Sequence, residues 1–147
     1  MNKKIVQTAL SLKKQYGTSD PTELCRCLGI TYLRADLPEK LGGFYMESKG
    51  RQAVAVSDRL DAPFDRAVSA HELGHALLHK GLNFIFLCDS TNFLPGRYER
   101  EADLFAAALL IDTARLKSGK SISLLSAESG VPIRAIEKLL DITGDCL

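Results

Sequence analysis

The chain has 147 residues, 46% of them apolar and 25% charged, which is the composition of one ordinary soluble globular domain. Its 19 basic and 18 acidic residues give a formal charge of +1, so no overall field would draw it to nucleic acid or to an anionic membrane. No apolar run approaches the roughly 20 residues of a membrane-spanning helix. Polar residues from Gln7 to Lys14 interrupt the apolar positions of the N-terminal segment, so we expect no signal peptide and a cytoplasmic location.

The cysteines do not show the paired C-x-x-C spacing of a metal or redox site. In a chain without a secretion signal we expect them to be free thiols. They are Cys25, Cys27, Cys88 and Cys146.

The first half of the chain changes from helical to strand patterns. One amphipathic helix is expected at residues 3–15, ending near Gly17. A second is expected from Pro21, with Asp20 as its N-cap, to Gly29. Three strands follow, and the last two of them form a hairpin. The strands are expected at residues 30–37, 43–48 and 52–57.

Helices dominate the second half. Two long helices are expected at about residues 62–80 and 97–116, with a short apolar strand at 84–87 between them. The tail, residues 121–140, is predicted to form two short helices broken at 129–132, similar to a helix-turn-helix. This order predicts a single α+β domain over residues 1–147, in which a small three- or four-stranded sheet packs with helices and a helical tail follows.

The strongest functional signal is the segment 71–75, with the sequence H-E-L-G-H. On a helix, residues four apart lie on one face, so His71 and His75 can bind one tetrahedral ion while Glu72 reaches a water at that ion. Both histidines also fall on the inward stripe of the helix with Val68 and Leu78. Unliganded imidazoles there would need other buried partners, so a zinc ion explains them more simply.

A catalytic zinc site with an open position needs a third protein ligand. His79 lies one further turn along, but three ligands at four-residue steps would span about 12 Å of helix axis, so we expect it to pack or hydrogen-bond beside the site. In the next helix, Glu99 and Asp103 share a face of small residues, whereas Glu101 points away and is expected in solvent. We therefore predict Glu99 as the third ligand and Asp103 as the carboxylate that accepts the outer N–H of a ligand histidine.

These two segments resemble the ImmA/IrrE family of metallopeptidases. The matching residues are 71–79, HELGHALLH, and 99–110, EREADLFAAALL, and the family's glutamate ligand corresponds to Glu99. The family's proline after the Leu-Leu is replaced here by Ile111-Asp112. The resemblance implies a zincin-like pair of active-site helices and a gluzincin-like zinc endopeptidase in which Glu72 activates the water. It also implies a helix-turn-helix transcriptional repressor as substrate, often encoded beside the peptidase on a mobile element or in a stress-response locus.

Other functions are compatible with the sequence. A regulatory protein without peptidase activity could keep this fold and bind a repressor or, through its tail, DNA. The near-neutral charge argues against DNA, and the complete set of ligands with Glu72 argues for catalysis. A hydrolase of small molecules would also carry H-E-x-x-H, and a broad cleft for an extended peptide would distinguish the peptidase from it. Arg97 and Tyr98 lie close enough in sequence to stabilise an oxyanion, although an exposed position at the helix start is their commoner environment.

Overall fold

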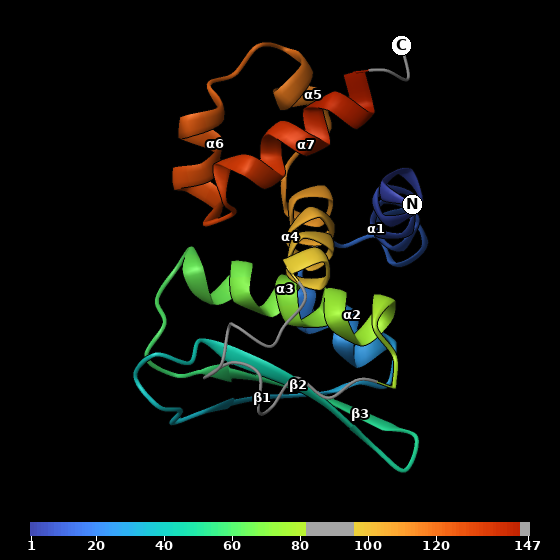
Figure 1. Ribbon diagram of the computed structural model, residues 1–147, viewed down its shortest axis with the longest axis vertical. Coiled ribbons are helices and arrows are strands. Elements are labelled where there is room, and N and C mark those ends of the chain that lie inside the picture. The colour runs from blue at the N-terminus through green and yellow to red at the C-terminus, as the bar shows by residue number, and fades with distance from the viewer. Residues whose placement is uncertain (82–95, 145–147) are drawn as a thin grey trace.

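The computed structural model describes residues 1–81 and 96–144, which form seven helices and three strands. The first elements are α1 (Asn2–Tyr16), α2 (Pro21–Cys27), β1 (Thr31–Ala35), β2 (Gly43–Ser48) and β3 (Arg51–Ser57). The later ones are α3 (Phe64–Leu78), α4 (Gly96–Leu110), α5 (Thr113–Lys117), α6 (Ile122–Ser129) and α7 (Ile133–Gly144). The sheet, α3, and then α4 with the C-terminal helices follow one another in space (Figure 1). No helix within the described ranges is both long and apolar enough to span a bilayer.

The sheet has the strand order β1-β3-β2. β1 runs parallel to the central strand β3, and β2 pairs with β3 in an antiparallel hairpin. The hairpin turns at Lys49 and Gly50, whose φ angles of 51° and 77° are those that a two-residue turn between twisted strands requires. Val54 and Val56 of β3 are fully buried, and α3 covers this face of the sheet (Figure 1).

Helices α3 and α4 cross at close range, and Gly74 makes this possible. A Cβ atom at Gly74 would lie 3.2 Å from the ring of Phe105 and 3.3 Å from the Cα atom of Ala102. Ala102 and Phe105 are themselves fully buried. A larger residue at position 74 would therefore push α4 away from the helix that carries His71 and His75.

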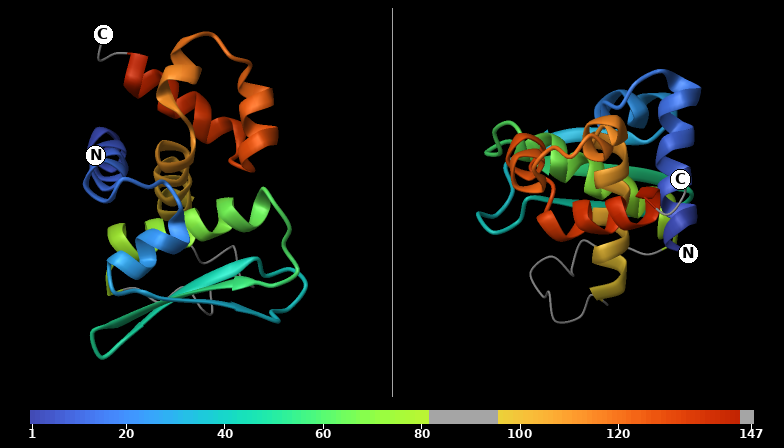
Figure 2. Two further views of the ribbon diagram at one scale, coloured as in Figure 1. Left: turned by 180° about the vertical axis from the view of Figure 1, so that it is seen from behind. Right: turned by 90° about the horizontal axis from the view of Figure 1, so that it is seen from above.

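The N- and C-terminal helices both pack against α4 (Figure 2). The buried residues of α1 are Ile5, Val6 and Ala9. Ile136 and Leu139 of α7 are fully buried and belong to the same hydrophobic cluster. The tail therefore shares its core with α1 and α4.

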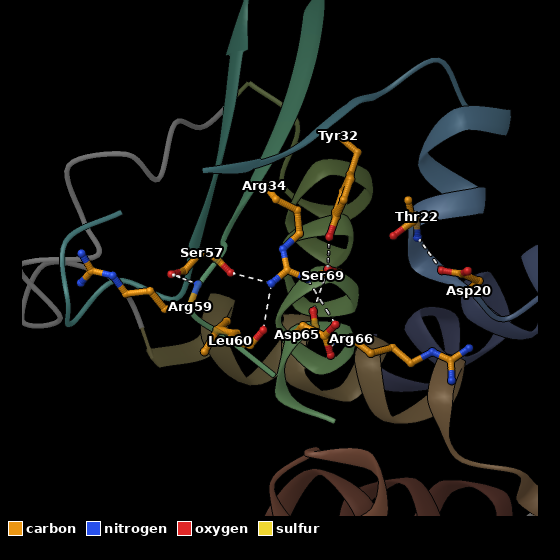
Figure 3. Close-up of polar contacts among 10 residues, drawn as sticks. All are labelled: Asp20, Thr22, Tyr32, Arg34, Ser57, Arg59, Leu60, Asp65, Arg66 and Ser69. Carbon is orange, nitrogen blue, oxygen red and sulfur yellow. Dashed lines mark hydrogen bonds and ion pairs between the residues drawn. The ribbon is translucent and has the colours of Figure 1, made fainter. Parts of the chain in front are cut away.

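A polar network on another face of α3 ties this helix to the sheet (Figure 3). The Tyr32 hydroxyl lies 2.9 Å from the Ser69 hydroxyl, and Ser69 donates to the carbonyl of Asp65 at 2.7 Å. Arg34 donates to the carbonyl of Leu60 at 2.8 Å and lies 3.3 Å from the Asp65 carboxylate. These contacts link β1 to the first turns of α3 and so fix the position of the H-E-x-x-H helix.

Most of the predicted elements are confirmed, and the α+β fold with a small sheet is among them. α1 ends at Gly17 in the left-handed conformation, and the Asp20 carboxylate accepts a hydrogen bond from the Thr22 N–H at 2.9 Å. The sheet has three strands in the described ranges, and the tail breaks at a left-handed Gly130. Cys25 and Cys27 are free, the first buried and the second exposed.

One predicted helix is wrong. Residues 97–116 form two helices, because α4 ends at Leu110 and α5 begins at Thr113. The Asp112 carboxylate accepts a hydrogen bond from the Ala114 N–H at 2.9 Å, and such a local bond competes with continuation of a helix. α3 is also shorter than the predicted 62–80. The strand expected at 84–87, together with Cys88 and Cys146, lies outside the described residues.

Candidate metal centre

Two histidines from α3 and one glutamate from α4 converge. The Nε2 atoms of His71 and His75 lie 3.2 Å apart. Glu99 places Oε1 2.8 Å from Nε2 of His75 and Oε2 3.4 Å from Nε2 of His71. These three residues each offer one ligand atom, and all three atoms lie within 4.8 Å of one another. The fold thus brings together the residues that the sequence nominates as ligands.

The spacing of these atoms fits a four-coordinate ion. Two ligands at about 2.0–2.1 Å from a tetrahedral ion are about 3.3 Å apart. Here the two Nε2 atoms are 3.2 Å apart, and each lies near a different oxygen of Glu99, His75 at 2.8 Å from Oε1 and His71 at 3.4 Å from Oε2. Two imidazole nitrogens and one carboxylate oxygen are also the donor set of zinc sites that leave one position open. The residues present can therefore hold a divalent metal ion.

The outer nitrogens of both histidines are engaged. Nδ1 of His71 lies 2.7 Å from Oδ1 of Asp103, and Nδ1 of His75 lies 2.8 Å from Nδ1 of His79. A ring that donates its Nδ1–H to such a partner has its lone pair on Nε2, which is the atom that faces the other ligands. Asp103 lies where the sequence places it, and His79 hydrogen-bonds beside the cluster, as expected.

Glu72 lies beside the ligands in the wall of the same cavity. It is 6% exposed, and its Oε1 atom has no hydrogen-bond partner among the described residues. β2 closes over this side chain, because a Cβ atom on Gly43 would lie only 3.3 Å from Cγ of Glu72. Burial raises the pKa of Glu72 to about 7. An unsatisfied buried carboxylate oxygen is costly, and a water held at a neighbouring ion would supply the missing hydrogen bond.

Two of the three proposed ligands, His75 and Glu99, are held in the protonation state that binds a metal ion, and the third, His71, would have to lose a proton. Burial lowers the pKa of His75 and so favours the neutral form, which is the form that binds a metal. Burial acts in the same direction on His71, but hydrogen bonds to Asp103 and Glu99 outweigh it and raise the pKa well above its usual value. For Glu99, burial alone would raise the pKa, but hydrogen bonds from both histidines hold it well below its usual range. A bound metal ion would displace the proton that His71 otherwise carries.

A cavity of about 310 Å³ opens over this cluster. Its walls include Gly43 at the start of β2, Phe64 at the start of α3 and Pro132 in the turn between α6 and α7. The helical tail is therefore part of the wall around the ligands. The site is assembled from β2, the crossing helices and the tail together.

One expectation about the first turn of α4 is wrong. Glu101 is not in solvent, because its side chain is only 13% exposed and Oε1 lies 2.8 Å from Nε2 of His79. Arg97 is exposed, as expected at a helix start, and neither Arg97 nor the partly buried Tyr98 lines the cavity over the ligands. The Tyr98 ring packs against His79 with centroids 4.7 Å apart, and the Arg97 guanidinium lies 5.0 Å above the Tyr98 ring. His79, Tyr98 and Glu101 thus contact one another beside the metal cluster. In the sequence, this grouping is indicated by the four-residue step from His75 to His79.

Comparison with known proteins places the chain in a family. The profile of the peptidase M78 family, described as an IrrE N-terminal-like domain, matches residues 25–140. This range extends from within α2 to within α7 and contains every residue of the metal cluster.

Two relatives are similar over most of this chain. Over 100 residues it is 36% identical to "Uncharacterized immunity region protein 2" of Bacillus phage phi105, a match that covers 68% of this chain and 63% of the phage protein. Over 110 residues it is 30% identical to "Metallopeptidase ImmA" of Bacillus subtilis (strain 168), which covers 75% of this chain and 64% of that protein. The matched part of the chain thus spans less than two thirds of each relative. The chain belongs to the peptidase M78 family, the ImmA/IrrE metallopeptidases that its two motif segments resemble.

Proposed function

We propose that this protein is a zinc-dependent endopeptidase that cleaves a peptide bond in a partner helix-turn-helix transcriptional repressor and so relieves repression. The position of Glu72 carries the proposal, because this buried carboxylate lies beside three converging ligand atoms and one of its oxygens has no hydrogen-bond partner among residues 1–81 and 96–144. Carboxylates with a purely structural role at this depth are normally hydrogen-bonded. This one is instead ready to contact a reacting water.

The donor set supports zinc. Imidazole and carboxylate ligands in a tetrahedral arrangement suit Zn²⁺, whereas Mg²⁺ and Ca²⁺ prefer six or more oxygen ligands. His71, His75 and Glu99 would hold the ion in a gluzincin-like arrangement and leave one position for water. The bound ion would lower the pKa of that water toward about 7 and polarise the scissile carbonyl.

Glu72 is the proposed general base. Its free oxygen can accept a proton from the attacking water and pass that proton to the leaving amine. A pKa raised to about 7 by burial is close to the value that a general base needs near neutral pH. Asp103 would hold His71 with its Nε2 atom directed at the ion.

The cavity over the cluster offers room and apolar walls for a peptide substrate. Gly43, the first residue of β2, lines the cavity over the ligands. A peptide bound in this cavity would lie directly over the proposed ligands. Phe64 and Pro132 provide apolar walls for its side chains.

A repressor partner is supported by the family and by the setting of one relative. The phage relative is named as an immunity region protein, which agrees with the mobile-element setting that the family resemblance implies. We propose a similar setting for this chain. Because a transcriptional repressor acts in the cytoplasm, the cleavage would take place there.

The test compares the wild type with Glu72→Gln, which keeps the size of the side chain but cannot take up a proton. Each protein is incubated with the helix-turn-helix repressor encoded nearest to its gene, and cleavage is followed on a gel while derepression is followed with a reporter in cells. The variant should fold, retain zinc and bind the repressor, yet cleave it about 10²- to 10⁴-fold more slowly.

Glu23→Gln is the matched control, because Glu23 is an exposed glutamate on α2. It should cleave the repressor as fast as the wild type does. Equal derepression by the wild type and Glu72→Gln would reject the peptidase and favour a regulatory protein that acts by binding. A gel-shift assay with operator DNA would then tell whether it binds the repressor or the DNA.

A further inference from the structure

The two histidines of the cluster are supported in different ways. His71 contacts a carboxylate directly, since its Nδ1 atom lies 2.7 Å from Asp103. His75 reaches a carboxylate through another histidine: its Nδ1 atom lies 2.8 Å from Nδ1 of His79. Nε2 of His79 lies in turn 2.8 Å from Oε1 of Glu101. Glu101 is therefore connected to the cluster although it does not belong to it.

This second connection is the more deeply buried of the two. The side chains of His75, His79 and Glu101 are 2%, 4% and 13% exposed. Those of His71 and Asp103 are 18% and 21% exposed. Because bulk water has little access, the ring nitrogens depend on hydrogen bonds within the protein, and these two contacts provide them for Nδ1 of His75 and for both nitrogens of His79.

Only one arrangement of protons satisfies both hydrogen bonds when Nε2 of His75 binds an ion. His75 then carries its proton on Nδ1 and donates it to Nδ1 of His79. Because Nδ1 of His79 accepts, the proton of His79 is on Nε2, from which it is donated to the Glu101 carboxylate. Glu101 thus selects the tautomer of His79, and His79 selects the tautomer of His75.

We propose that His79 and Glu101 are positioning residues of the metal site, which together hold the His75 ring with its Nε2 lone pair directed at the ion. The inference rests on the proposed role of His75 as a zinc ligand. Metal-binding histidines usually donate their outer N–H to a carboxylate or a carbonyl. Here the immediate partner of His75 is another histidine, His79, and the Glu101 carboxylate contacts His79 rather than His75. A third histidine at the same four-residue step thereby has a role without being a ligand.

The experiment measures zinc affinity by competition with a chromophoric chelator. His79→Phe keeps an aromatic ring but cannot accept the proton, and should weaken zinc binding roughly 10- to 100-fold. Glu101→Gln keeps the side-chain size but loses the charge, and should weaken binding about 10-fold. In the His79→Phe background, Glu101→Gln should have no further effect, because Glu101 acts through His79.

Two further readouts separate positioning from a general structural role. Co²⁺ bound in place of Zn²⁺ absorbs visible light according to its ligand field, and this spectrum should change in Glu101→Gln at full occupancy. Thermal unfolding of the metal-free Glu101→Gln protein should stay close to that of the metal-free wild type. Glu137→Gln makes the same chemical change on an exposed glutamate of α7 and should leave affinity, spectrum and unfolding unchanged.

The inference is overturned if both single variants keep the zinc affinity and the Co²⁺ spectrum of the wild type. It is also overturned if Glu101→Gln weakens binding equally with and without His79. If His79→Phe fails to fold, the affinity and spectrum of Glu101→Gln decide the question. A wild-type protein that takes up no zinc would instead overturn the metal site itself, so the two failures can be told apart.

Discussion

The two faces of α3 differ in how their polar groups are satisfied. On the face toward β1, Tyr32 pairs with Ser69 and Arg34 pairs with Asp65 (Figure 3). A cavity of about 630 Å³ adjoins these residues, twice the size of the one over the metal cluster. On the metal face, by contrast, an oxygen of Glu72 is buried with no hydrogen-bond partner in the described part of the chain. Incomplete hydrogen bonding rather than cavity size marks the reactive face, because an ion and a water would complete it.

The largest effect is expected from Glu99→Ala, which removes one of the three ligands on the metal face. Two histidines alone would leave half of the coordination positions without protein ligands, so zinc binding at one ion per chain should be lost. Elemental analysis after dialysis measures this, with Glu23→Ala as the control that keeps its zinc. A Glu99→Ala protein that retains zinc, while Glu101→Ala loses it completely, would mean that the ligand on α4 is misassigned.

Because burial raises the pKa of the Glu72 carboxyl, the unfolding free energy of the metal-free protein should depend on pH. Its pKa is about 7 in the folded state against an ordinary value of 4.5, so folding favours the protonated carboxyl. This stability is fully present below pH 4.5 and is lost as the pH rises through about 7, a change on the order of 3 kcal/mol at most. Urea unfolding should therefore find metal-free Glu72→Gln more stable than the wild type at pH 8, with the difference vanishing near pH 4.5. A difference independent of pH would contradict the burial of a free carboxyl.

Asp103→Ala should have an intermediate effect on the metal face. Without the Asp103 carboxylate at 2.7 Å, the outer N–H of His71 loses its acceptor, and zinc affinity should fall roughly 10- to 100-fold. Asp103→Asn keeps an oxygen that can accept this bond and should recover part of the loss. Chelator competition measures both, and an Asp103→Ala protein with wild-type affinity would show that His71 needs no such partner.

Sequence predicts those features of the two faces of α3 that follow from the spacing of residues within one helix. It does not predict contacts between residues of different elements. The four-residue step predicts His71 and His75, and the phase of α4 separates Glu99 from Glu101. The contact of Glu101 with His79 depends on how α4 crosses α3, and ridge-and-groove packing allows several crossing angles. Likewise, no local pattern predicts the contact between Tyr32 and Ser69, which are 37 residues apart in the sequence.

The sequence pattern does not predict the break after α4, for a different reason. Residues 97–116 contain no proline or central glycine, so their composition is helical throughout. The signal that a helix ends there is the single capping residue Asp112, which starts α5. One cap inside a helical pattern is easily outweighed by its neighbours when only propensities are read.

The smallest effect is expected on the other face of α3. Tyr32→Phe removes the hydroxyl that contacts Ser69, but Ser69 still donates to the carbonyl of Asp65. The variant should lose about 0.5–1.5 kcal/mol of unfolding free energy and keep wild-type zinc affinity and cleavage rate. Denaturant unfolding and the cleavage assay measure the two quantities. A large drop in zinc affinity would show that the two faces are coupled through α3.

The most direct measurement is the zinc content of the wild-type protein purified without chelator. The central claim is that His71, His75 and Glu99 hold a single catalytic ion. We predict close to one zinc per chain at neutral pH, with release in mild acid as the ligand histidines take up protons. A protein that contains no zinc, and takes up none when zinc is added, would contradict the claim.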